Sequence, residues 1–150
     1  DAAQLMANSA KKAGIDIEVI REPNDGYWSN VWNNDAKGWC ACYWGGRPAE
    51  TMMFSAAYVA ESKWNDTSWK TTDSAVKFNQ LVKDARKELD ENKKRDILFE
   101  CQRLIYDDGG LLCPLFNSYV SANSKKIAHG KIAANWDSDG AKCVERWWFA

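Results

Sequence analysis

The chain has 150 residues, the size of one domain, and lysine plus arginine (20) almost balance aspartate plus glutamate (21). That balance argues against a dedicated nucleic-acid binder and against a polybasic membrane-surface module, because both need a basic surplus. Nine tryptophans, five tyrosines and five phenylalanines exclude a disordered chain.

The first part of the chain predicts helices alternating with strands. Residues 2–13 have a helical pattern that ends at a glycine, and alternating apolar residues over 15–21 predict a half-buried strand. A turn-rich stretch then precedes a short helix that runs to about residue 33. Residues 39–44 predict a second strand.

An irregular stretch follows the second strand. Two glycines and a proline within 45–48 break regular structure, and a short helical turn is expected near 51–58. Residues 62–72 predict a polar loop that carries tryptophans.

Two amphipathic helices are the strongest predicted elements. Apolar residues recur at helical spacing over 73–89, with Asp73 or Ser74 as the N-cap. The second helix spans about 91–107, and Asp90 is its expected N-cap.

The rest of the chain predicts strand and loop. Residues 111–120 form an apolar stretch interrupted by Pro114, which is typical of an edge or crossing strand. The last 30 residues are read as strand and loop. Because helices alternate with strands, we expect an α/β fold.

Catalytic groups are scarce. His129 is the single histidine and has no acid near it in the sequence, and no nucleophile elbow, phosphate loop or dinucleotide motif occurs. Cys40 and Cys42 share one face of the predicted strand, where a disulfide between them would be strained. We read them as small buried residues or as partners of other cysteines. No zinc-ligand pattern is present, and neither an enzyme, a metal nor a cofactor is expected.

Six segments, in order along almost the whole chain, carry a resemblance. The first three are Ala-Lys-Lys-Ala-Gly-Ile-Asp-Ile-Glu-Val at 10–19, Tyr-Trp-Gly-Gly-Arg-Pro at 43–48 and Lys-Trp-Asn-Asp-Thr-Ser-Trp at 63–69. The fourth is the predicted helix pair, with Phe-Asn-Gln-Leu-Val-Lys-Asp-Ala-Arg at 78–86, then Asp90, Arg95 and Cys-Gln-Arg at 101–103. The last two are Leu-Cys-Pro-Leu-Phe-Asn at 112–117 and Glu-Arg-Trp-Trp-Phe-Ala at 145–150. Together they resemble the C-terminal part of the family 5 extracellular solute-binding proteins, which are the peptide, oligopeptide and nickel binders of ABC transporters.

The resemblance implies a fold and a function. Such proteins are bilobed, class II-like periplasmic binding proteins that close on a solute and deliver it to a membrane permease. Residues 1–113 would be part of the C-terminal ligand-binding lobe, and 114–150 would be the hinge crossing and return segment to the first lobe. The chain is then expected to be a fragment of a periplasmic protein, or of an extracellular one held to the membrane through a missing N-terminal part.

The first candidate site lies at the glycine-rich turn. Gly45 and Gly46 let an extended protein segment approach a peptide-like ligand, and Trp44 offers a side wall. Family members carry an Asp after the Trp of this turn, which holds the α-ammonium of the ligand, whereas this chain has Arg47. A guanidinium favours a ligand carboxylate instead. The alternative is that Arg47 is solvated or pairs with Glu50.

Two further groups complete the predicted site. Trp64, Asn65 and Asp66 place an aromatic wall beside amide and carboxylate groups, or alternatively form a capped loop that packs on the helix pair. Phe116 and Asn117 follow the crossing proline, where they would touch ligand at the hinge.

Alternatives remain open. A small thiol-dependent enzyme would use Cys40 or Cys42 as its nucleophile, and a sugar-binding member of the same transporter class would use the tryptophans to stack on sugar rings. As one wall of a cleft, the fragment should bind ligand poorly by itself. Its unpaired strand edges should make it self-associate.

Overall fold

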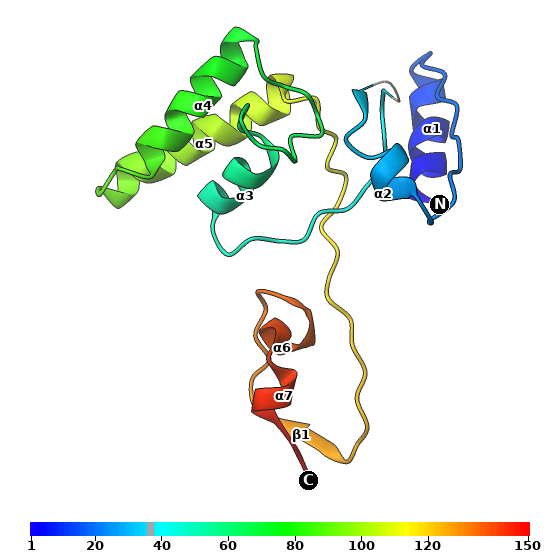
Figure 1. Ribbon diagram of the computed structural model, residues 1–150, viewed down its shortest axis with the longest axis vertical. Helices are drawn as coiled ribbons and strands as arrows, with labels where there is room; N and C mark the ends of the chain where they lie inside the picture. Colours follow the sequence, from blue (N-terminus) through cyan, green and yellow to red (C-terminus); the bar gives the residue numbers. More distant parts are fainter. Residues whose placement is uncertain (36–37) are drawn as a thin grey trace. The chain divides into compact units, whose positions relative to one another are not determined.

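The computed structural model describes residues 1–35 and 38–150. Residues Asp1–Tyr43 form one compact unit and Trp44–Ala150 form a second. Figure 1 shows the helices and strands of both units.

The first unit contains two helices. Helix α1, Ala2–Lys12, confirms the helix predicted at 2–13 and buries Ala7. Gly14 follows it with a φ of 79°, a left-handed conformation that glycine adopts without a steric penalty. Helix α2, Tyr27–Asn30, is the short helix expected after the turn-rich stretch.

The strands predicted at 15–21, 39–44 and 111–120 are absent from the described chain, so these three predictions were wrong. An alternating apolar pattern suits a strand, but a strand exists only where a neighbouring segment supplies hydrogen-bond partners. Within residues 1–35 and 38–150, no segment forms a ladder with any of the three. The α/β class and the assignment to a lobe therefore stay predictions.

The sheet of the described chain has two short strands. Strand β1, Ile127–His129, pairs antiparallel with strand β2, Trp147–Phe149, and places His129 opposite Trp147. Between them lie two helical turns, α6 (Asp137–Ala141) and α7 (Cys143–Arg146).

Asp139 organises this C-terminal hairpin from a buried position. Its carboxylate accepts hydrogen bonds from the Ala133 amide at 2.6 Å and the Trp147 indole at 3.0 Å, and it lies 3.2 Å from the Arg146 guanidinium. The hydrogen bond from the Ala133 amide contributes most to lowering the pKa of Asp139. These contacts hold the left-handed backbone of residues 138–141 in place.

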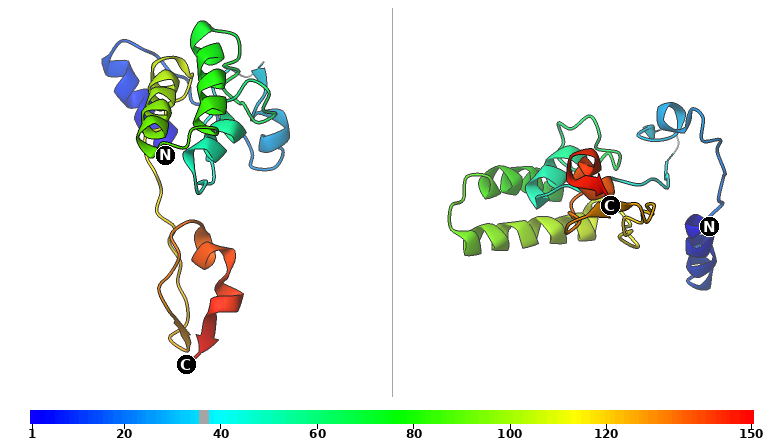
Figure 2. Two further views of the ribbon diagram at one scale, coloured as in Figure 1. Left: turned by 90° about the vertical axis from the view of Figure 1, so that its left-hand side faces the viewer. Right: turned by 90° about the horizontal axis from the view of Figure 1, so that it is seen from below.

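The helix pair confirms the strongest sequence predictions. Helix α4, Asp73–Ala85, and helix α5, Glu91–Asp108, lie side by side along their lengths in every view (Figures 1 and 2). Helix α4 ends four residues before the predicted residue 89, and Leu89 is exposed.

The caps of the two helices differ in how well they were predicted. Asp90 caps α5 as expected, because its carboxylate accepts from the amides of Asn92 and Lys93. Helix α4 is capped by Thr72 rather than by Asp73 or Ser74, since the Thr72 hydroxyl accepts from the third amide of the helix.

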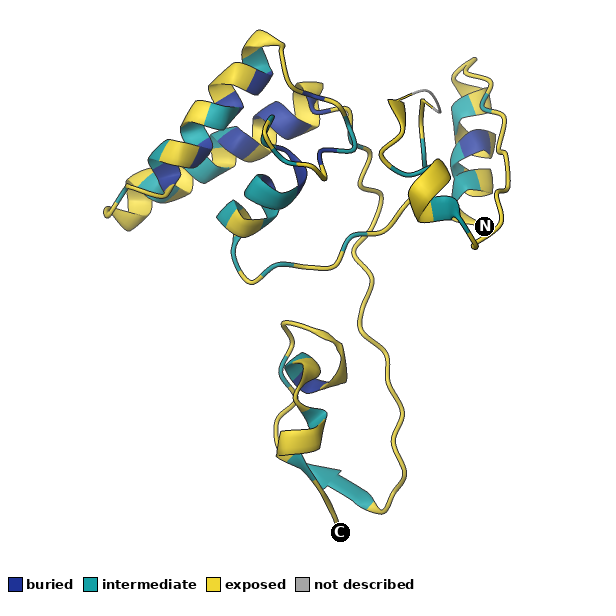
Figure 3. Cartoon of the chain, viewed as in Figure 1, coloured by how far each residue is buried: buried dark blue, intermediate teal, exposed yellow. Residues whose placement is uncertain are grey.

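The core lies between the helix pair and helix α3, Glu50–Ala57 (Figure 3). Phe78 of α4 is at its centre and is completely buried. Its ring contacts those of Phe54, Tyr58 and Trp69, with centroids 5.6, 6.5 and 5.1 Å away. This core fixes the loop between α3 and α4, which carries one of the predicted site segments.

Candidate functional site

The structure joins two segments that the sequence suggested separately. The indole Nε1 of Trp44 donates a hydrogen bond to Asp66 Oδ2 at 3.2 Å, and the contact is partly buried. The start of the glycine-rich turn therefore lies next to the loop that contains Trp64, Asn65 and Asp66. An aromatic ring, a carboxylate and a turn of glycines lie together there.

Asn65 holds this loop in shape. It is 1% exposed, and its amide nitrogen donates to three backbone carbonyls while its amide oxygen accepts from the Thr67 hydroxyl at 3.0 Å. The three carbonyls are those of Tyr58 at 3.2 Å, Val59 at 3.3 Å and Trp69 at 3.1 Å. The interpretation of this segment as a packed loop thus fits Asn65, whose side chain faces the protein backbone.

Trp64 and Trp69, at the two ends of the predicted segment 63–69, have opposite environments. Trp69 is buried against Phe78, whereas Trp64 is 54% exposed. Because Trp64 is next to the loop-forming Asn65 and two residues before Asp66, its ring is presented to solvent from a fixed backbone. Of the two tryptophans, Trp64 is the one that can stack on a ligand.

The side chain of Arg47 folds back onto the backbone of the glycine-rich turn. Its Nη1 donates to the carbonyl oxygens of Gly45 at 2.7 Å and Gly46 at 3.3 Å. The predicted partner Glu50 begins helix α3. The guanidinium therefore covers the two backbone acceptors that an extended ligand would use.

Tyr119 is a site neighbour that the sequence interpretation missed. A methyl group added at Gly46 would lie 3.8 Å from the Tyr119 hydroxyl, an ordinary van der Waals distance. Phe116, in the same segment, is 94% exposed, and Asn117 is exposed too. The predicted hinge segment thus approaches the glycine turn through Tyr119. Its signal in the sequence was an aromatic residue two positions beyond the predicted Asn117.

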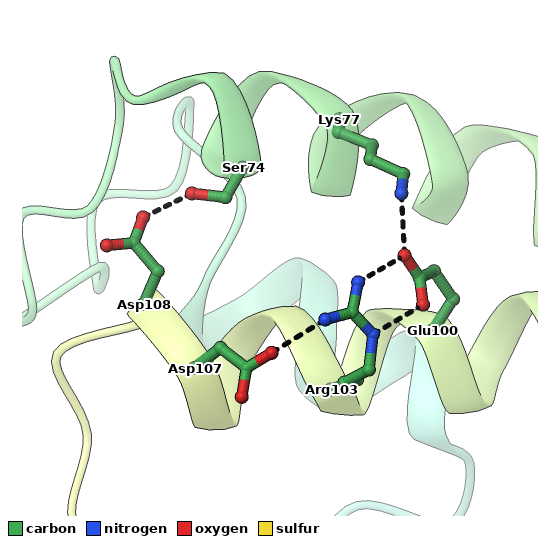
Figure 4. A network of polar contacts seen from close by, with 6 residues as sticks. All are labelled: Ser74, Lys77, Glu100, Arg103, Asp107 and Asp108. Atoms are coloured by element: carbon green, nitrogen blue, oxygen red, sulfur yellow. Dashed lines mark hydrogen bonds and ion pairs between the residues drawn. The ribbon is translucent and has the colours of Figure 1, made fainter.

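Asp108 is a second residue that the sequence did not reveal. Its carboxylate accepts hydrogen bonds from the Trp69 indole and the Thr72 hydroxyl, both at 2.8 Å. It also accepts one from the Ser74 hydroxyl, which Figure 4 shows. The hydrogen bonds from Ser74, Trp69 and Thr72, in that order, lower the pKa of Asp108. The end of α5 is thereby tied to the loop that carries Asp66.

A second polar network spans the two long helices (Figure 4). Glu100 accepts from Arg103 at 2.8 Å and from Lys77 of α4 at 2.6 Å, and Arg103 also reaches Asp107 at 2.7 Å. The bonds from Arg103, and then from Lys77, lower the pKa of Glu100 to about 2. The network is largely exposed, so each of its ion pairs contributes only a little to stability.

The other candidate groups for chemistry are placed as follows. Cys101 is buried in the core, and burial raises the pKa of its thiol to about 11, so it is not a thiolate at neutral pH. His129 packs against Trp147 with ring centroids 5.0 Å apart. In the part of the chain that the structure describes, no group of three or more His, Cys, Asp or Glu side chains is arranged to hold a metal.

No protein-family model, curated protein or solved structure matches the chain. Among the helices of residues 1–35 and 38–150, none has both the length and the apolar character needed to cross a membrane.

Proposed function

We propose that this chain is part of the substrate-binding component of an ABC transporter, which binds a small solute and delivers it to a membrane permease. The observation that carries the proposal is the hydrogen bond from Trp44 to Asp66. It brings the segment that resembles a ligand-facing turn of family 5 solute-binding proteins together with the segment that resembles the loop before their paired helices. Under this proposal 1–113 belongs to the second lobe and 114–150 to the crossing segment. The protein then works in the periplasm, or outside the cell at the membrane.

The glycine turn suits a peptide-like ligand with a carboxylate. Arg47 leaves the carbonyl oxygens of Gly45 and Gly46 and binds the ligand carboxylate through two N–H groups. The two carbonyls then accept N–H groups from the ligand backbone, as in strand addition. Trp44 and the exposed Trp64 form apolar walls, and Asp66 fixes the Trp44 ring.

A sugar ligand is the second candidate, and the exposure of Trp64 favours it. An exposed indole gives a sugar ring a flat apolar surface. This binding mode needs no carboxylate, so it predicts affinity that is independent of Arg47.

The test uses the complete protein that carries these residues. Calorimetry compares short peptides, the same peptides with an amidated C-terminus, and a glucose oligosaccharide. We expect the free-acid peptides to bind, and Arg47→Ala to weaken them by about 2–5 kcal/mol, the usual cost of removing one partner of a buried charge pair. Arg47→Lys should recover only part of the loss, because an ammonium does not reproduce the two-pronged contact.

Two comparisons isolate the contact. Amidation should weaken binding to the wild type but much less to Arg47→Ala, which is the pattern of a double-mutant cycle. Arg95→Ala is the matched control, since Arg95 is an exposed arginine of α5 that lies 3.8 Å from Asp96. Binding of the oligosaccharide alone would favour the sugar alternative, and saturable binding of none of these ligands would refute the proposal.

A further inference from the structure

The chain contains the pair Asp-Gly three times, at 25–26, 108–109 and 139–140. Aspartate followed by glycine is prone to close into a five-membered cyclic imide, because glycine has no side chain to hinder attack by its amide nitrogen on the aspartate side chain. The reaction needs two accessible groups, the backbone N–H of the glycine and the carboxyl group of the aspartate. What these two groups contact differs among the three pairs.

The pair Asp25-Gly26 lies in a turn directly before helix α2. The Asn24 carbonyl accepts a hydrogen bond from the Tyr27 amide at 3.4 Å, which closes the turn, and Asp25 is exposed. Within residues 1–35 and 38–150, the Gly26 amide donates to no acceptor, and the Asp25 carboxylate has neither a hydrogen-bond donor nor an ion-pair partner. Both reacting groups are therefore accessible.

The pair Asp108-Gly109 has both groups occupied. Gly109 is buried, and its amide donates to the Ile105 carbonyl at 2.9 Å, at the end of α5. The Asp108 carboxylate accepts from the three donors described above, which lower its pKa and so keep it ionised. An ionised carboxylate resists attack, because its carbon is a poor electrophile and lacks a hydroxyl that can leave.

The pair Asp139-Gly140 is occupied in the same way. Asp139 is buried, and its carboxylate accepts from the Ala133 amide and the Trp147 indole. The Gly140 amide donates to the Trp136 carbonyl at 3.3 Å. One sequence pair therefore occurs in one open and two closed environments within the same chain.

We propose that Asp25-Gly26 is a site of spontaneous aspartate isomerisation, and that the fold protects the same pair at 108–109 and 139–140. The Gly26 nitrogen attacks Cγ of the protonated Asp25 side chain. A new N–Cγ bond replaces the Cγ–OH bond, and the hydroxyl group and the amide proton leave as water. A second water then opens the imide: attack at the backbone carbonyl of Asp25 gives isoaspartate, and attack at Cγ restores aspartate. Solvent water is the sole co-reactant.

Isoaspartate alters the entry to α2. The main chain then runs through the Asp25 side chain and gains one carbon atom directly before Gly26. The Gly26 carbonyl accepts hydrogen bonds from the amides of Ser29 and Asn30 at 3.2 and 2.9 Å. The modification therefore acts at the residue that holds the first turn of α2.

The experiment incubates the folded chain in water enriched in heavy oxygen at about pH 5, where an ordinary aspartate is still protonated in part. Each imide hydrolysis adds one heavy oxygen atom, so peptide mass spectrometry counts the reaction at each pair whichever product forms. We expect Asp25 to take up label at least about tenfold faster than Asp108 or Asp139, because the protected pairs react only from locally opened states. A protease that cleaves before aspartate but not before isoaspartate should leave part of the labelled chain uncut before residue 25.

Two controls separate the effect of the fold from that of the sequence. In guanidinium chloride all three pairs should take up label at similar rates, because the same pair is then exposed at each position. Asp25→Glu keeps the charge and should abolish labelling at residue 25, since its longer side chain would have to close a less favourable six-membered ring.

Three outcomes would overturn the proposal. They are equal rates at the three pairs in the folded chain, slower labelling of Asp25 than of Asp108 or Asp139, and continued labelling of residue 25 in Asp25→Glu. Persistence of the native order of rates in guanidinium chloride would also overturn it, because flanking residues rather than the fold would then set the rates. These outcomes are independent of whether the protein binds peptides.

Discussion

Truncation of Phe78 tests whether the helix pair and the loop with Asp66 share one core. Phe78 is 0% exposed, and its ring contacts Phe54, Tyr58 and Trp69. Phe→Ala changes in cores cost about 3–5 kcal/mol through lost burial and the cavity that remains. Because three aromatic neighbours each lose a ring contact, we expect Phe78→Ala to cost no less than the middle of that range, about 4 kcal/mol.

Urea unfolding followed by far-ultraviolet circular dichroism measures this loss. With a slope of about 2 kcal/mol/M, a loss of about 4 kcal/mol lowers the midpoint by about 2 M. Phe78→Leu keeps most of the volume and should cost about 1–1.5 kcal/mol. The control is Phe99→Ala on the neighbouring helix, where the side chain is 58% exposed and the expected change is within about 0.5 kcal/mol. A loss below about 1 kcal/mol for Phe78→Ala, or equal losses at both positions, would refute the reasoning.

Three further predictions follow from the polar contacts and the thiols. Asn65→Ala should lower the free energy of unfolding by about 1–3 kcal/mol in urea titrations, because buried carbonyls lose their donor, and an unchanged midpoint would contradict the role of Asn65. Since Arg103 and, less strongly, Lys77 lower the pKa of Glu100 from 4.5 to about 2, this group stabilises the fold above about pH 4.5, and the contribution is lost as the pH falls towards 2. Glu100→Gln and high salt should both flatten acid unfolding curves in that window, and a wild-type slope in the variant would disprove the assignment. Iodoacetamide should label buried Cys101 far more slowly than exposed Cys113 in the native chain, but equally in urea, as read by peptide mass spectrometry; equal native rates would show that Cys101 is not buried.

The helices could be predicted because their signals are local. The spacing of apolar residues over 73–85 and the carboxylate of Asp90 act within one or two turns of chain. Strands depend on partners elsewhere, and residues 15–21, 39–44 and 111–120 have the pattern of strands without a neighbour that pairs with them in the described chain. The spacing of apolar residues in these three segments therefore shows which side chains are apolar. It does not show whether the backbone forms a hydrogen-bonded ladder with another strand.

The candidate site was predicted in parts. Trp44 and Asp66 were both named, but their contact joins residues 22 positions apart, which no local pattern reveals. The role of Asn65 was undecidable from sequence, because the same amide group can bind a ligand or hold a loop. Asp108 was missed for a similar reason, since its partner Thr72 lies 36 positions away.

The position of Arg47 bears on which ligand the proposed site prefers. Without ligand, its guanidinium is held by two neutral carbonyl oxygens, those of Gly45 and Gly46. A carboxylate carries the charge opposite to the guanidinium and can accept two parallel N–H bonds from it, so a ligand carboxylate draws Arg47 away from the turn. That movement also frees the two exposed carbonyls, which can then accept hydrogen bonds from a ligand amide or from water. A peptide C-terminus supplies the carboxylate together with a neighbouring amide N–H, whereas a neutral sugar offers donors but no anion to displace Arg47. A peptide C-terminus can therefore bind Arg47 through its carboxylate and a freed carbonyl through its amide N–H. For this reason we expect the proposed site to prefer a peptide-like ligand over a neutral sugar.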